Sequence, residues 1–208
     1  IAAYGSLIAT RQMGNRWQAS EGPEIIYNAA TGYYYLFVAY DALETPYNTR
    51  VCRSRNINGP YLGIDGVNLT QDGGEMLPVV THPYKFSNSH GWVGISHCAV
   101  FDDGNGNWYY ASQGRFPENV GGNAYSNALM MGHVRSIRWN SQGWPVVMPE
   151  RYGAVPQIAI TEDELIGNWE HIDLSYSYGK QKESSNMTLA ADHTITSGIW
   201  KGSSWSYD

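Results

Sequence analysis

The chain has 208 residues, with 13 Lys and Arg against 19 Asp and Glu, and therefore a formal net charge of −6. This acidic balance argues against nucleic acid as a partner, because such binding rests on basic patches that neutralise phosphates, and nothing in it favours an anionic membrane surface. No apolar run reaches the roughly 18 residues of a membrane-spanning helix.

Composition narrows the class of fold. Charged residues make up 15% of the chain, against about 25% in an average domain, while Gly (23), Tyr (16) and Trp (8) are abundant. This favours short twisted strands joined by tight turns, with most rings in the sheet core, although carbohydrate-binding clefts share the same composition. Cys52 and Cys98 set no disulfide framework, so we expect two buried free thiols.

Strand signals recur along the chain and helix signals are rare. Strands are predicted where β-branched and aromatic residues run together, at residues 24–28, 32–41, 49–55, 97–103, 107–114, 127–139 and 145–149. Clusters of Asn, Asp, Gly and Pro mark turns between them. A short helix is predicted around Thr161 to Leu165, and residues 81–92 are expected to be a long loop that shapes a cleft. The chain is therefore predicted to be all-β.

A weak internal repeat runs through the first part of the chain. Glu21 lies over His97 at an offset of 76 residues, and at the same offset the tyrosines at 33 and 34 fall on those at 109 and 110. A repeat of this length with several strands per unit fits a β-propeller blade with long loops. Because the first strand of each blade lines the propeller axis, the repeat predicts equivalent axial positions for Glu21 and His97.

The pattern of residues along the sequence changes after Tyr152. Residues 1–155 are predicted to be the C-terminal blades of a β-propeller, and residues 156–208 to begin a small C-terminal β-domain. At 76 residues per unit the first part holds two blades, which cannot close a ring and would expose open sheet edges. The first residues, IAAYGSLIATRQ, include no initiator Met and no secretory leader. We therefore expect the other blades to come from an N-terminal half, on a separate or cleaved chain.

Four motifs together carry a resemblance to a known enzyme family. They are SEGPEIIY (20–27) with GYYYLFV (32–38), YNTRV (47–51) with GPY (59–61), GISHCAV (94–100) with QGR (113–115), and HVRSI (133–137) with GWPVV (143–147) and PERY (149–152). They resemble the arabinan-degrading enzymes of glycoside hydrolase family 43, in the C-terminal portion of the longer members. The resemblance implies part of a five-bladed β-propeller followed by an incomplete C-terminal β-barrel or sandwich-like domain.

The resemblance gives this chain one catalytic carboxylate, Glu21, as general acid. In the family a Glu before Gly-Pro opens a blade and protonates the leaving sugar. The general base and a residue that tunes the acid are both Asp on earlier blades, and we give those roles to none of Asp41, Asp102 or Asp103. Inversion needs acid and base about 6.5–9.5 Å apart, and the pKa of the acid must be raised by burial or a neighbouring carboxylate. Without the resemblance, Glu21 reads as a surface residue at a strand end.

The same resemblance gives His97 a metal role. Family members place a His at the propeller centre beside a metal ion, usually calcium, which implies one Ca²⁺ near the axis held by His97 and water. Calcium prefers six to eight oxygen ligands. On residue chemistry alone a lone His is more often a hydrogen-bonded core residue, and that alternative stays open.

Three further residues are predicted to bind substrate. Arg115 is expected to reach the sugar or to pair with a catalytic carboxylate, with a plain strand salt bridge as the alternative. Tyr40 and Asp41 end a predicted strand near Glu21 and are expected to line the cleft. Glu24, three residues after Glu21, faces the other side of its strand and reads as structural.

The resemblance implies a secreted endo-α-1,5-L-arabinanase that cleaves arabinan or arabino-oligosaccharides with inversion and needs its N-terminal half for activity. Two alternatives remain. One is a sister enzyme of the family, an exo-acting α-L-arabinofuranosidase or a β-xylosidase. The other is a non-catalytic carbohydrate-binding propeller fragment, because the chain by itself offers one catalytic carboxylate. An intracellular location remains an alternative to secretion.

Overall fold

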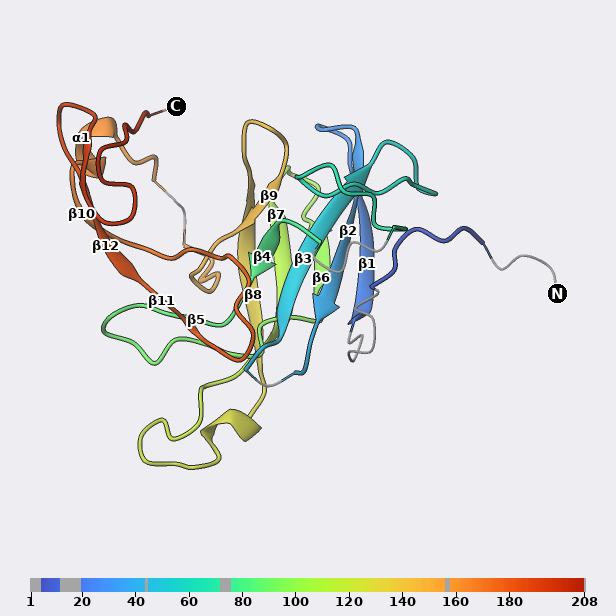
Figure 1. Cartoon of the computed structure of the whole chain (residues 1–208), viewed down its shortest axis with the longest axis horizontal. Coiled ribbons are helices and arrows are strands. Elements are labelled where there is room, and N and C mark those ends of the chain that lie inside the picture. Colours follow the sequence, from blue (N-terminus) through green and yellow to red (C-terminus); the bar gives the residue numbers. More distant parts are fainter. Residues whose placement is uncertain (1–4, 12–19, 44, 72–75, 156–157, 208) are drawn as a thin grey trace.

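The computed structural model describes residues 5–11, 20–43, 45–71, 76–155 and 158–207. In these ranges the chain forms two four-stranded antiparallel sheets and, to one side of them, a three-stranded sheet (Figure 1). Helical elements are short, namely the 3₁₀ turn η1 (Ser126–Ala128) and the helix α1 (Glu162–Leu165). The predictions of an all-β chain and of a short helix near Thr161 are confirmed.

The first blade sheet is a meander in the order β1-β2-β3-β4. Its strands are β1 (Ser20–Asn28), β2 (Tyr33–Tyr40), β3 (Asn48–Ser54) and β4 (Val79–Thr81). Because alternate residues of a strand point to opposite faces, β2 places Tyr35 and Phe37 in one buried cluster and Leu36 and Val38 in another. The run YYYLFVAY is apolar because both faces of β2 are covered, by the second blade sheet on one side and by Tyr61, Leu69 and Met76 on the other.

The second blade sheet repeats that order as β6-β7-β8-β9. Its strands are β6 (Ala99–Asp102), β7 (Trp108–Gly114), β8 (Met131–Trp139) and β9 (Pro145–Val147). The two blade sheets share one core, in which Tyr35 and Phe37 of the first meet Val100, Tyr110 and others of the second. Two successive units of equal strand order are what the internal repeat predicts.

The match of tyrosines within the repeat is off by one residue. Asn28 pairs with Tyr33 at the end of the first hairpin, and Asp102 pairs with Trp108 at the end of the second. The second turn is one residue longer, but the stretch from His97 to Asp102 is two residues shorter than that from Glu21 to Asn28. Together these differences make Tyr35, not Tyr34, the structural counterpart of Tyr110. Both of these side chains are fully buried in the shared core.

The C-terminal sheet has the order β10-β12-β13, with β10 (Gly167–His171), β12 (Ser185–Leu189) and β13 (Ile195–Ser197). The helix α1 precedes it and begins with a capping box, in which the Glu164 carboxylate accepts hydrogen bonds from the backbone N–H and hydroxyl of Thr161. Such reciprocal capping satisfies the open N–H groups of a first turn, so a four-residue helix persists here.

The segment 81–92, predicted as a long loop, contains the strand β5 (Tyr84–Lys85), which pairs in parallel with β11 (Lys182–Glu183) of the C-terminal region. The side chain of Gln181 adds hydrogen bonds to the carbonyls of Tyr84 and His90. Residues 81–92 are thus held by contacts about 95 residues away in sequence. No local pattern signals such a strand.

Cys52 and Cys98 are free thiols in the buried interior, as the sequence predicts. Burial raises the pKa of the Cys98 thiol to about 12, so it stays protonated at neutral pH. Among the residues that the structure describes, no helix has the length and apolar character needed to cross a membrane.

His133 makes folding stability depend on pH. Its ring is fully buried beside Arg135, whose Nη1 donates to His133 Nδ1 at 3.0 Å, and burial followed by the charges of Arg135 and Arg151 lowers its pKa to about 4. Because the unfolded chain binds this proton near pH 6.5 and the folded chain does not, stability falls as pH drops from 7 to 4, by up to about 3 kcal/mol. Urea unfolding at pH 7, 6, 5 and 4.5 measures this loss.

His133→Gln is the control, because its amide oxygen still accepts from Arg135 and does not titrate. The variant is expected to lose less stability over the same pH range than the parent. Equal pH dependence of the two proteins would contradict the assignment to His133.

Candidate active site

Glu21 and His97 meet at the start of the two blade sheets. Glu21 lies in β1 just before a bulge, between Glu21 and Glu24, in its pairing with β2. His97 precedes β6 with a left-handed backbone at φ +56°. Their nearest atoms, Glu21 Oε1 and His97 Nδ1, are 3.5 Å apart. The structure therefore brings together the carboxylate and the imidazole that the repeat predicts at equivalent positions.

Tyr47, the first residue of the YNTRV motif, joins the two groups, although the sequence predicted no role for it. Its hydroxyl donates to Glu21 Oε1 at 2.6 Å and lies 3.0 Å from His97 Nδ1. Because the single hydroxyl proton goes to Glu21, the His97 contact requires an Nδ1–H donor. The Nε2 of a neutral His97 then carries the free lone pair. The signal in the sequence is its place at the start of the YNTRV motif (47–51), to which no role for the tyrosine was attached.

Gly22 makes the close approach possible. Its backbone is left-handed at φ +54°, and a Cβ at this position would meet the His97 ring at 3.0 Å. A side chain there would have to displace the imidazole, and the left-handed conformation itself favours Gly. The Gly of the SEGP motif is therefore explained by the packing of His97.

A buried network of hydroxyl groups lies next to Tyr47 and His97. Thr49 Oγ1 lies 2.6 Å from Ser96 Oγ and 2.7 Å from Tyr110 Oη, and Ser96 Oγ donates to the backbone carbonyl of Asn48 at 2.9 Å. Asn48 follows Tyr47 and Ser96 precedes His97. The network thus fixes the backbone on both sides of the site.

The site is open on the side of the acid. The side chains of Glu21 and His97 are 53% and 57% exposed, while Tyr47 is buried. The described residues therefore do not supply the enclosure that keeps a general acid protonated. An acid held by Tyr47 and facing outward can donate a proton to a group bound above it.

Asp41 lies inside a polar cluster. One carboxylate oxygen pairs with Arg11 at 2.8 Å, and the other accepts from Asn48 Nδ2 at 3.0 Å and from the Tyr176 hydroxyl at 2.7 Å. Its neighbour Tyr40 is buried, with the guanidinium of Arg11 over its ring. These contacts favour structural roles for Tyr40 and Asp41, and their assignment to substrate binding stays a prediction.

Arg115 follows β7 and is also largely buried. Its backbone pairs with that of Val93, and its Nη1 donates to the carbonyl of Asn127 at 3.3 Å. Its Nε is buried without a hydrogen-bond partner within the described part of the chain. The structure shows no strand salt bridge for Arg115 in that part, and its role toward substrate stays a prediction.

A metal ion at His97 would receive few protein ligands from this chain. No three His, Cys, Asp or Glu side chains gather as a metal site in the ranges that the structure describes. The free Nε2 of His97 suits a cation, but one imidazole falls short of the oxygen-rich shell that calcium prefers. Among the described residues, His97 is therefore the one protein ligand on offer, and water would have to supply the oxygen atoms of the shell.

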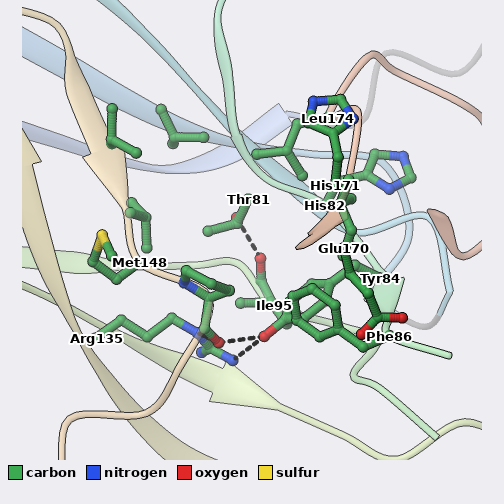
Figure 2. A pocket seen from close by; sticks show the side chains of 15 residues that line it. Thr81, His82, Tyr84, Phe86, Ile95, Arg135, Met148, Glu170, His171 and Leu174 are labelled. Atoms are coloured by element: carbon green, nitrogen blue, oxygen red, sulfur yellow. Dashed lines mark hydrogen bonds between the residues drawn. The ribbon is translucent and has the colours of Figure 1, made fainter. Parts of the chain in front are cut away.

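An apolar cavity of about 260 Å³ lies elsewhere, where both blade sheets meet the C-terminal region. Figure 2 shows its lining, with Thr81 and Tyr84 from the first unit, Arg135 and Met148 from the second, and His171 and Leu174 from the C-terminal region. None of the residues predicted for the site lines it. We read it as an imperfectly filled junction between domains.

Two family models match the chain. The model of glycosyl hydrolases family 43 matches residues 5–145, and that of a C-terminal lipocalin-like domain matches residues 149–208. Extracellular endo-α-(1→5)-L-arabinanase 2 of Bacillus subtilis is 27% identical over an alignment of 216 positions. The alignment covers 91% of this chain and 44% of the relative. The extracellular endo-α-(1→5)-L-arabinanase of Thermotoga petrophila is 28% identical, covering 91% and 42%.

Solved structures agree with these matches. The crystal structure of endo-1,5-α-L-arabinanase from Thermotoga petrophila in complex with Tris superposes with a TM-score of 0.74 at 27% identity, covering 86% of this chain and 42% of that one. A Cellvibrio cellulosa α-L-arabinanase complexed with arabinohexaose shares the fold, with a TM-score of 0.52 at 24% identity, covering 69% and 43%. This chain thus spans less than half the length of these relatives.

Proposed function

The chain belongs to glycosyl hydrolase family 43, and from this membership we propose that it is the acid-bearing part of an enzyme that cleaves α-1,5-linked L-arabinofuranose units of arabinan with inversion. It comprises a portion of the family's β-propeller followed by a lipocalin-like β-domain. The similarity to endo-arabinanases supports the substrate class. The observation that carries the proposal is the convergence of Glu21, Tyr47 and His97 at the mouth of the blades.

In the proposed reaction Glu21 protonates the leaving glycosidic oxygen while a water attacks the opposite face of the sugar. That water loses its proton to an Asp base, and a second Asp tunes Glu21; both are proposed to come from the N-terminal half. Within this chain Tyr47 holds Glu21 through a hydrogen bond to Oε1. The other carboxylate oxygen, Oε2, is then available to carry and donate the proton.

The surfaces of the two blade sheets support a companion half. Ile25 and Tyr27 are exposed on the face of the first blade sheet that points away from the second, and Phe101 and Val134 are exposed on the opposite outer face. Blades of a closed propeller pack on a neighbour at each face. We propose that an N-terminal half of the same enzyme, on a separate or cleaved chain, covers both faces.

The test is an assay of the chain together with its companion half on linear arabinan, with chromatography of the products. A ladder of arabinose oligomers is expected. Release of single arabinose units would instead establish the exo-acting alternative, and activity on xylan alone the β-xylosidase. Binding of arabinan without cleavage by the assembled particle would establish a carbohydrate-binding fragment and overturn the proposal.

We also propose one Ca²⁺ near the axis, bound by Nε2 of His97 and completed by water. Its support is the protonated Nδ1 that the Tyr47 contact requires. No step of the reaction is assigned to the ion. Removal of metal with EDTA is expected to lower the melting temperature of the parent and to leave His97→Ala unchanged, as measured by thermal unfolding. An equal response of both proteins, or of neither, would overturn the site.

Both curated relatives described above are named extracellular enzymes. Because polymeric arabinan is a substrate met outside the cell, we propose secretion for the enzyme that contains this chain. Arabinan or arabino-oligosaccharide is its proposed partner, with no role for nucleic acid or membrane.

A further inference from the structure

We infer that Tyr176, which belongs to the C-terminal region, is a positioning residue for Glu21 and acts through Asp41, Asn48 and Tyr47. This inference rests on the proposed function of Glu21 as general acid. It assigns the C-terminal region a part in the geometry of the site, although none of that region's described residues takes part in the Glu21 and His97 contacts.

The first link joins the two parts of the chain. The Tyr176 hydroxyl donates to Asp41 Oδ2 at 2.7 Å across 135 residues of sequence. The next residue, Ser177, donates its backbone N–H to Nε2 of the buried His82 at 3.3 Å. Burial and the hydrogen bond to Asp41 raise the pKa of Tyr176, so its hydroxyl remains a donor at neutral pH.

The second link is a layer of stacked and hydrogen-bonded groups. The guanidinium of Arg50 lies 4.4 Å from the centre of the Tyr176 ring and 4.5 Å from that of Tyr40. Its Nε donates to Asn48 Oδ1 at 2.9 Å. Arg50 and Asn48 are fully buried. Tyr176 therefore contacts this layer with its ring as well as with its hydroxyl.

The third link runs from Asn48 to the acid. Asn48 Nδ2 donates to Asp41 Oδ2 at 3.0 Å and to the Pro46 carbonyl at 2.9 Å, so one amide holds the turn on both sides of Tyr47. The Tyr47 hydroxyl then holds Glu21 Oε1 at 2.6 Å. A shift of the Asp41 carboxylate is transmitted through Asn48 to the residue that aims the acid.

The contacts of Tyr176 allow its effect on the position of Glu21 to be tested separately from its effect on folding. In Tyr176→Phe, Asp41 keeps Arg11 and Asn48 as partners and Arg50 keeps an aromatic ring, so the fold is expected to remain intact. What is lost is the hydroxyl that fixes Oδ2 of Asp41. Because small misplacements of catalytic groups cost large factors in rate, kcat on arabinan is expected to fall about tenfold with KM unchanged.

The experiment compares Tyr176→Phe and Tyr176→Leu with Tyr178→Phe, a control at an exposed tyrosine two residues away. In the active particle, kcat is measured on aryl arabino-oligosaccharides whose leaving groups span a range of pKa. Poor acid alignment penalises basic leaving groups most, so Tyr176→Phe is expected to steepen this dependence and Tyr176→Leu to steepen it further. A dependence equal to that of the parent would overturn the inference.

A second readout uses this chain alone and needs no activity. Hydrogen exchange of backbone amides in residues 41–51 is expected to accelerate in Tyr176→Phe and to match the parent in Tyr178→Phe. Unchanged exchange in Tyr176→Phe would overturn the coupling. If the assembled particle is inactive but exchange is accelerated in Tyr176→Phe, the proposed function is contradicted while the link between Tyr176 and this segment is supported.

Discussion

Replacing Glu21 with Gln is expected to lower kcat of the assembled enzyme on arabinan by about 10²–10⁴-fold, the range typical of general acid catalysis. The Gln side chain has the same shape, and its oxygen still accepts from the Tyr47 hydroxyl, which holds Glu21 at 2.6 Å. What it lacks is a proton to give to the leaving sugar. The measurement is the initial rate of oligomer release, with binding of arabino-oligosaccharide as a check that KM is unchanged.

The matched control is Glu24→Gln, on the same strand beyond the bulge. It removes the same charge three residues away and is expected to retain activity. A substrate with a highly acidic leaving group should restore most of the rate of Glu21→Gln, because such a group departs without protonation. Equal losses for the two variants, or no rescue by the activated substrate, would contradict the role of Glu21 as acid.

Replacing Asp41 with Asn is expected to destabilise the fold by about 3 kcal/mol, the lower part of the range for removing one partner of a buried ion pair. The pair with Arg11 is 2.8 Å long, and both side chains are almost fully buried. Asn tolerates the left-handed backbone of this position, at φ +72°, so the substitution changes charge without straining the chain. Urea unfolding gives the free-energy difference.

The contrast is Glu183→Gln, which breaks the pair between Lys85 and Glu183. This pair is 2.7 Å long, but its side chains are 37% and 70% exposed. Solvent-exposed pairs contribute about 0–1 kcal/mol, so this variant is expected to unfold close to the parent. If the two substitutions lower the free energy of unfolding by the same amount, the cluster around Asp41 does not stabilise the fold in the way that its burial indicates.

The strands and the meeting of Glu21 with His97 were predictable because both follow from local patterns. Aromatic and β-branched runs mark the strands, and the repeat aligns the two strand starts. The alignment erred by one at Tyr34 because spacing in sequence reveals neither the bulge that lengthens the first strand after Glu21 nor the extra residue of the second hairpin turn. Bulges and turn lengths are fixed by the pairing of the two strands and not by the residue types at equal spacing.

The roles of Tyr47 and Tyr176 could not be predicted from the sequence for a different reason. Each acts on a partner supplied by another strand or domain, at separations of 26 and 135 residues. Whether such a hydroxyl reaches a carboxylate depends on how the sheets stack, and a single sequence does not encode that distance in any local pattern. Asp41 shows the same limit, since its position near the strand end predicts a cleft residue and its contacts place it in a buried cluster.

The long reach of the Tyr176 bond also sets an order of events during synthesis. The first blade sheet and the pair of Arg11 with Asp41 can form once Thr81 has emerged from the ribosome, but residue 176 follows 95 positions later. At 5–20 residues per second, that interval is about 5–19 s. The nascent chain can therefore complete its first sheet before the hydrogen bond from Tyr176 is made, and Glu21 reaches its final setting only after residue 176 has been synthesised.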